Sequence, residues 1–161
     1  MSARATSGRG QGRGSARAAA RLAAVQALYQ HEMEATPQAL LLDEFHQHRL
    51  GAEIDDDTSG EGRYAEAETP FFDAVVAGVL ARREEIDALI AGKLAAGWSL
   101  TRLDKTMLQI LRAGVWELLA RADVPTGAAI SEYLDVAHAF FDPREAKFVN
   151  GVLDAVAKAV R

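Results

Sequence analysis

The sequence contains no cysteine among its 161 residues, and aromatic residues make up only 7% of it. Without cysteine the chain forms neither a disulfide nor a thiolate metal site, a composition that suits a reducing cytoplasm. It also lacks an apolar run long enough to span a membrane and a recognisable secretory signal, so we expect a cytoplasmic protein with no membrane association. Patterns typical of β-strands are nearly absent, which favours an all-α fold.

Recognisable catalytic motifs are missing as well. The sequence shows no cysteine nucleophile, serine-centred turn, paired metal ligands or nucleotide-binding loop. His46 and His48 lie two residues apart, a spacing that does not place both on one face of a helix, so we expect no metal site there. The acidic residues lie in one loop or on solvated helix faces. We therefore expect a binding protein rather than an enzyme, with no cofactor.

Positive charge is concentrated at the N-terminus. The net charge is −5, yet residues 1–21 contain no acid and five arginines: Arg4, Arg9, Arg13, Arg17 and Arg21. The other 13 basic residues stand against all 23 acidic ones, so residues 22–161 carry a net charge of −10. A basic arm on an acidic body indicates an anionic partner for the arm, although an inert soluble tail would have the same composition.

Helical periodicity begins near residue 15 and, apart from the segment 51–68, continues to the end of the chain. Residues 1–14 are mostly Gly, Ser and Arg with little to bury, so we expect a disordered basic arm before a single all-helical domain over 15–161. The acidic segment 51–68 predicts a long loop. Six helices are predicted, over residues 15–33, 37–49, 69–96, 101 or 103 to 120, 126–140 and 142–160.

The clearest helix signal is the C-terminal segment Asp142–Val160. Asp142 predicts an N-cap, Pro143 occupies the first helical position, and Glu145 is placed to close a capping box. Apolar residues then recur at helical spacing: Phe148, Val149, Val152, Leu153, Val156 and Val160. Gly151 lies in the middle of this helix, where glycine costs about 1 kcal/mol relative to alanine. We therefore expect another helix to pack closely against Gly151, so that Gly151→Leu would damage the fold.

Five strings of the sequence are specific enough to compare with a family. They are RAAARLAAVQALY (17–29), ILRAGVWEL (110–118), DVP (123–125), AISEYLDVAHAFF (129–141) and KFVNGVLDAVA (147–157). In this order they resemble the NusB family of bacterial transcription antitermination factors. The resemblance implies an all-α fold of two packed three-helix bundles. It also implies pairing with the ribosomal protein NusE, binding of the pair to the boxA element of nascent ribosomal RNA, and help for the RNA polymerase elongation complex in resisting termination.

Matched by position, the resemblance implies an RNA-binding surface on the first helix. Arg17 and Arg21 correspond to the family's basic N-terminal motif, and Arg13 adds charge from the arm. Some members have an unbroken arginine cluster there, whereas three alanines separate Arg17 from Arg21 here. The motif is therefore thinner in this chain, and the upstream arginines would compensate.

The resemblance extends this surface to Tyr29 and to the C-terminal helix. Tyr29 matches a tyrosine near the RNA, and Lys147 and Phe148 match the start of a helix that borders both RNA and NusE. Arg144 and Phe148 are assigned to NusE, with Arg144 standing where some members have an acid. Helical spacing is equally compatible with Tyr29 and Phe148 in the core, so the sequence leaves both alternatives open for each.

Two other functions stay compatible with the sequence. One family of RNA methyltransferases carries a NusB-like domain at its N-terminus, and the chain would then be the RNA-binding module of an enzyme whose catalytic domain follows Arg161. A purely structural homodimer is the other, because the family includes dimers that occlude the basic surface. A mass measurement with and without RNA separates the homodimer from the RNA-binding protein.

Overall fold

The structure is a computed structural model that describes residues 3–51 and 68–161, with side chains from residue 14 onward except at 48, 49 and 51. The described residues form helices and their connections without a β-strand, which confirms the predicted all-α class. The chain divides into two compact units, Met1–Ala74 and Val75–Arg161. The acidic loop predicted at 51–68 falls outside the described residues over 52–67. Among the described helices, none combines the length and apolar character that crossing a membrane requires.

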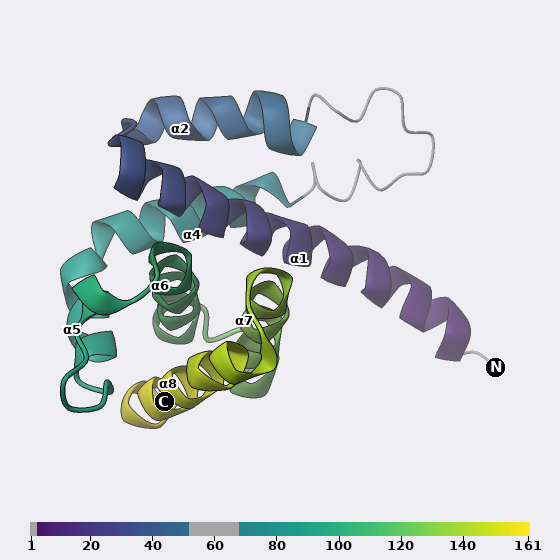
Figure 1. Cartoon of the computed structure of the whole chain (residues 1–161). Coiled ribbons are helices and arrows are strands. Elements are labelled where there is room, and N and C mark those ends of the chain that lie inside the picture. The colour runs from purple at the N-terminus through teal and green to yellow at the C-terminus, as the bar shows by residue number, and fades with distance from the viewer. Residues whose placement is uncertain (1–2, 52–67) are drawn as a thin grey trace. The chain divides into compact units, whose positions relative to one another are not determined.

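The first unit contains α1 (Ala3–Glu34), α2 (Gln38–Phe45), the π-helical turn η1 (His46–Gly51) and the first residues of α4 (Thr69–Ala81). α1 ends where Ala35 adopts a left-handed φ of 56°. α2 then returns beside α1 (Figure 1). The side chain of Gln30 fastens this corner, donating to Thr36 Oγ1 at 3.3 Å and Glu44 Oε2 at 3.1 Å. The apolar faces meet in a core that includes Ala24, Val25, Leu28, Leu41, Phe45 and Phe72.

α1 begins at Ala3 rather than at Ser15. The composition predicts disorder for residues 3–14. In the structure these residues continue the helix, so the prediction and the structure differ over this stretch. The physical reason is that extending an existing helix fixes one residue for each hydrogen bond gained, whereas starting a helix is costly. Arginine and alanine favour the extension, and the interspersed glycines oppose it by about 1 kcal/mol each.

The second unit contains the rest of α4, followed by α5 (Arg83–Ala91), the 3₁₀ turn η3 (Leu100–Arg102), α6 (Lys105–Ala120), α7 (Thr126–Phe140) and α8 (Pro143–Val160). α6, α7 and α8 pack against one another in pairs as a three-helix bundle, and α5 packs on α6 and α8 (Figure 1). α6 is the centre of this unit, because every residue from Met107 to Leu118 is buried. The single helix predicted over 69–96 is broken at Arg82, whose φ of −116° and ψ of 23° leave the helical region.

Side-chain caps fix the starts of α6 and α8. Asp142 Oδ1 accepts a hydrogen bond from the Glu145 N–H at 3.0 Å, which confirms the predicted N-cap. Asp104 Oδ1 accepts from the N–H groups of Thr106 at 2.8 Å and Met107 at 3.1 Å. α6 therefore begins after Asp104, and the residues just before it, predicted as part of the helix, form η3 instead.

The prediction that a helix packs closely on Gly151 is wrong. Gly151 is exposed, and a Cβ placed there would meet no atom of the described residues within 4 Å. Successive residues of α8 are about 100° apart around the helix axis. Gly151 therefore lies on the side of the helix away from the buried stripe through Val149, Val152 and Leu153. Close approaches occur instead at Gly78, where a Cβ would overlap the indole of Trp116, and at Gly114, where it would lie 2.9 Å from Leu153 Cδ2 on α8.

Arg161 closes the C-terminal end of α6. Its guanidinium donates to the carbonyl oxygens of Leu118 at 2.9 Å, Arg121 at 2.9 Å and Val124 at 2.8 Å, and to Thr126 Oγ1 at 3.0 Å. The last four carbonyls of a helix lack partners within it, so a cation with several N–H donors is well suited to this place. The Arg161 side chain thus links the end of α8 to α6, to α7 and to the residues between those two helices.

Candidate nucleic-acid interface

The first cationic group lies on α1 in the first unit. Arg17 and Arg21 share a helical face, and their guanidinium carbons lie 4.9 and 5.0 Å from the ring centroid of Phe71. Such cation–π contacts contribute about 0.5–2 kcal/mol each. Arg17 Nε also donates to Glu68 Oε2 at 3.4 Å. Phe71 and Glu68 therefore hold the arginines in place, and the sequence analysis did not identify either residue.

The two arginines differ sharply in exposure. The Arg17 side chain is 36% exposed, whereas Arg21 as a whole is only 3% exposed. Arg21 thus packs against Phe71, and Arg17 is the accessible cation of the pair. Arg13 precedes Arg17 by four residues on α1, which places the two positions on one face of the helix, and its side chain is outside the described part.

Tyr29 lies further along α1 and is 40% exposed. Helical spacing was compatible with Tyr29 either in the core or at the surface. The structure places it at the surface. A partly exposed phenol ring can stack on an unpaired base while the remainder of the side chain stays packed.

The second cationic group lies at the start of α8 in the second unit. Arg144 and Lys147 are exposed, and Phe148 is half-buried. At about 100° per residue, Arg144 lies about 40° from Phe148 and about 60° from Lys147, so the three residues occupy adjoining positions around α8. Phe148 therefore borders the core without being enclosed by it, so both of the alternatives for this residue hold in part.

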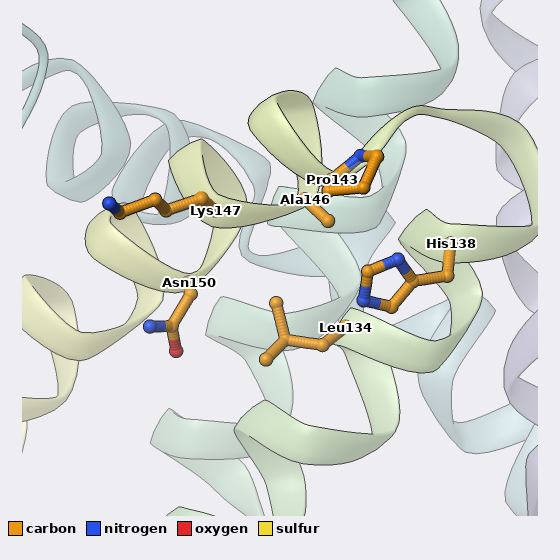
Figure 2. A pocket seen from close by; sticks show the side chains of 6 residues that line it. All are labelled: Leu134, His138, Pro143, Ala146, Lys147 and Asn150. Atoms are coloured by element: carbon orange, nitrogen blue, oxygen red, sulfur yellow. The ribbon is translucent and has the colours of Figure 1, made fainter.

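Beside Lys147 the surface between α7 and α8 is hollowed to a volume of about 210 Å³ (Figure 2). Leu134, Pro143 and Ala146 supply apolar groups, and His138, Lys147 and Asn150 supply polar ones. Within the described residues no group of three His, Asp or Glu side chains is arranged to hold a metal ion. The hollow is an open surface that combines apolar groups with the cationic side chain of Lys147.

The comparisons with known proteins agree on one family. The sequence model of the NusB family matches residues 18–158. The transcription antitermination protein NusB of Novosphingobium aromaticivorans is 70% identical over 137 residues, which cover 85% of this chain and 89% of that protein. The protein of the same name from Sphingopyxis alaskensis is 64% identical with the same coverage.

Solved structures give the same answer for the fold. NusB of T. maritima matches with a TM-score of 0.69 and 30% identity, over 88% of this chain and 90% of that chain. A structure of the antitermination factors NusB and NusE in complex with double-stranded RNA contains a chain that matches with a TM-score of 0.67 and 28% identity, over 89% of this chain and 97% of that chain. Sequence and fold together show that the chain belongs to the NusB family.

Proposed function

We propose that this protein is a transcription antitermination factor that binds boxA of nascent ribosomal RNA together with the ribosomal protein NusE. The main support is the 70% identity to a protein named transcription antitermination protein NusB. The accessible arginine Arg17 is the next observation in its favour, although the family model begins one residue later, at 18. A relative of the same fold was solved with NusE and RNA. The complex would act on the RNA polymerase elongation complex in the cytoplasm, and the protein would work by binding, without catalysis.

The chemistry of the two cationic groups suits this task. Arginine and lysine contact phosphates, and partly exposed aromatic rings stack on unpaired bases. Arg13, Arg17 and Lys147 would hold the backbone of the RNA, and Tyr29 would offer a ring to a base. Phe148, with Arg144 on the same flank of α8, would border both RNA and NusE.

The direct test of this function is reconstitution. The protein is co-purified with NusE, and the complex is titrated with boxA RNA and with a scrambled RNA of the same length and composition. We expect tighter binding to boxA than to the scrambled RNA, and tighter binding by the complex than by either protein alone. Equal affinity for the two RNAs would contradict the proposed function.

Replacing both Arg13 and Arg17 by glutamine is expected to weaken RNA binding and to reduce its dependence on salt. Each lost phosphate contact on a single strand lowers the slope of log affinity against log salt by about 0.7, so the double variant should lose about 1.4. The slope is measured by fluorescence anisotropy of labelled boxA RNA. Deleting residues 1–21 is a poorer test, because Ala16, Ala20 and Arg21 are buried.

Arg82→Gln provides the matched control for charge. Arg82 is an exposed arginine paired with Glu85 at 2.5 Å, and it is not among the proposed contacts. Its replacement removes one positive charge elsewhere, half of the charge that the double variant removes, and should leave the slope unchanged. A double Arg13/Arg17 variant with the wild-type slope would show that this face of α1 does not meet phosphates.

Replacing Phe148 by alanine is expected to affect RNA binding more than folding. Loss of one stacked base costs about 1–3 kcal/mol of binding, and a half-buried ring should cost less stability than the roughly 3–5 kcal/mol of a fully buried one. Binding and thermal unfolding are measured on the same preparation. Val149→Ala is the control, because Val149 is fully buried and should lose stability while the folded fraction binds normally. A large loss of stability with normal boxA binding would assign Phe148 to the core.

A further inference from the structure

The connector between α5 and α6 carries an exposed aromatic side chain that the proposed RNA contacts do not include. Trp98 is 55% exposed, whereas the other tryptophan of the chain, Trp116, is 6% exposed. A single exposed apolar residue is ordinary on a protein surface, so its meaning depends on its surroundings. Three features of this connector favour Trp98 as a ligand contact: its fixed backbone, the neighbouring arginine and the local charge.

The backbone around Trp98 is ordered by its own hydrogen bonds. Gly97 adopts a φ of 88°, a conformation that favours glycine, and so turns the chain into Trp98. The Trp98 N–H donates to the Ala95 carbonyl at 3.0 Å, and the Ser99 carbonyl accepts from the Arg102 N–H at 3.0 Å. The connector therefore presents the indole from a fixed turn, which lowers the entropy lost when a ligand binds.

Arg102 lies over the ring of the indole. Its guanidinium carbon is 5.8 Å from the Trp98 ring centroid, and its Nη1 donates to the Gly97 carbonyl. Both residues are exposed. The pair thus offers a flat π surface and a planar cation with further N–H donors at one place, the combination that binds a base and its phosphate in single-stranded nucleic acid.

The local charge is opposite to that of the body. Residues 92–105 contain three basic side chains, Lys93, Arg102 and Lys105, and one acid, Asp104. Asp104 is engaged as the N-cap of α6. The segment 92–105, which is the connector together with Lys105 at the start of α6, carries a net charge of +2, within residues 22–161 that sum to −10. A polyanion repelled by most of the body would meet an attractive potential here.

We propose that the segment 92–105, the connector with the first residue of α6, is a further RNA contact, in which an unpaired base stacks on Trp98 and a neighbouring phosphate pairs with Arg102. The inference rests on the proposed RNA-binding function and adds a contact outside α1 and α8. Stacking on an indole tolerates any base, so this contact would bind nucleotides with little regard to sequence. An acidic protein segment would satisfy the cations and leave the ring face unused, and RNA is therefore the occupant that the geometry favours.

Trp98 is itself the reporter for the test. The protein, alone and with NusE, is titrated with boxA RNA and with boxA extended by an unpaired oligouridine tail, while tryptophan emission and RNA anisotropy are both recorded. We expect quenching that Trp98→Phe abolishes with little loss of affinity. Trp98→Ala should weaken binding of the extended RNA by about 5- to 150-fold. Leu40→Ala is the matched control, because Leu40 is 51% exposed and apolar and its loss should change nothing.

The possible results separate this inference from the proposed function. Normal boxA binding without quenching, and with a Trp98→Ala variant equal to wild type, would overturn the inference and leave the function standing. Failure of the wild-type protein to bind either RNA, with or without NusE, would overturn both. Quenching of Trp98 by polyglutamate and not by RNA would assign the connector to an acidic protein partner and overturn the RNA contact.

Discussion

Replacing Gly78 by alanine is expected to destabilise the protein by about 1–3 kcal/mol or more, the usual cost of forcing extra atoms into a packed core. A Cβ at Gly78 would overlap the indole of Trp116, a large side chain that is only 6% exposed. A buried indole cannot move aside as the end of a flexible side chain would, so the helices α4 and α6 must separate locally. Urea denaturation measures the loss, which should appear as a lower midpoint at an unchanged slope.

Gly151→Ala is the control for this substitution. It makes the same chemical change in a helix where a Cβ meets nothing, and it should be neutral or stabilise by up to about 1 kcal/mol. Combining Gly78→Ala with Trp116→Phe removes the indole atoms that clash, so the double variant should lose less than the sum of the single ones. A Gly78→Ala protein as stable as wild type would show that α4 and α6 do not approach closely here.

Replacing Asp87 by alanine is expected to cost about 3 kcal/mol or more. Arg112 donates to Asp87 through two parallel hydrogen bonds, Nε to Oδ1 at 2.8 Å and Nη2 to Oδ2 at 2.9 Å. The Arg112 side chain is 7% exposed and that of Asp87 is 23% exposed. Removing one partner of a buried ion pair takes that counterion away from the other charge, which costs about 3–5 kcal/mol. The partial exposure of Asp87 places the expected value at the lower end.

The double variant Asp87→Ala with Arg112→Met tests the cause of that loss. Because it removes the buried cation together with its partner, it should recover much of the stability that Asp87→Ala alone loses. The free energy of unfolding is measured for the four members of the cycle under the same conditions. If the double variant is less stable than Asp87→Ala, the cost arises from lost packing of Arg112 rather than from its charge.

The helices were predictable because their signals are local. The capping sequence at Asp142 and the apolar spacing after it involve residues within a few turns, and the structure has the same start for α8. The break at Arg82 and the extension of α1 to Ala3 were not predictable in this way. The apolar spacing is the same on both sides of a short break in a helix, so it does not reveal the break. The extension of a helix depends on the stability of the part already formed, which the local sequence does not give.

The candidate site was predictable only as a set of residue types. The spacing of Arg17 and Arg21 places them on one face, yet their different exposures follow from Phe71, which is distant in the sequence and close in space. Gly151 shows the same limit, because the periodicity of α8 identifies its apolar stripe but not the neighbours of every position. A role for Trp98 is not predictable from the sequence, because an exposed aromatic residue in a connector has no periodic pattern around it.

The guanidinium of Arg161 has a consequence for the order in which the second unit forms. Its acceptors lie some forty positions earlier in the chain, for example the Leu118 carbonyl at a separation of 43 residues. Contacts of such long range form late, because a large loop must close before they contribute. During synthesis on the ribosome, the end of α6 would stay hydrated until residue 161 had left the exit tunnel. Substitution of Arg161 should therefore speed unfolding more than it slows refolding.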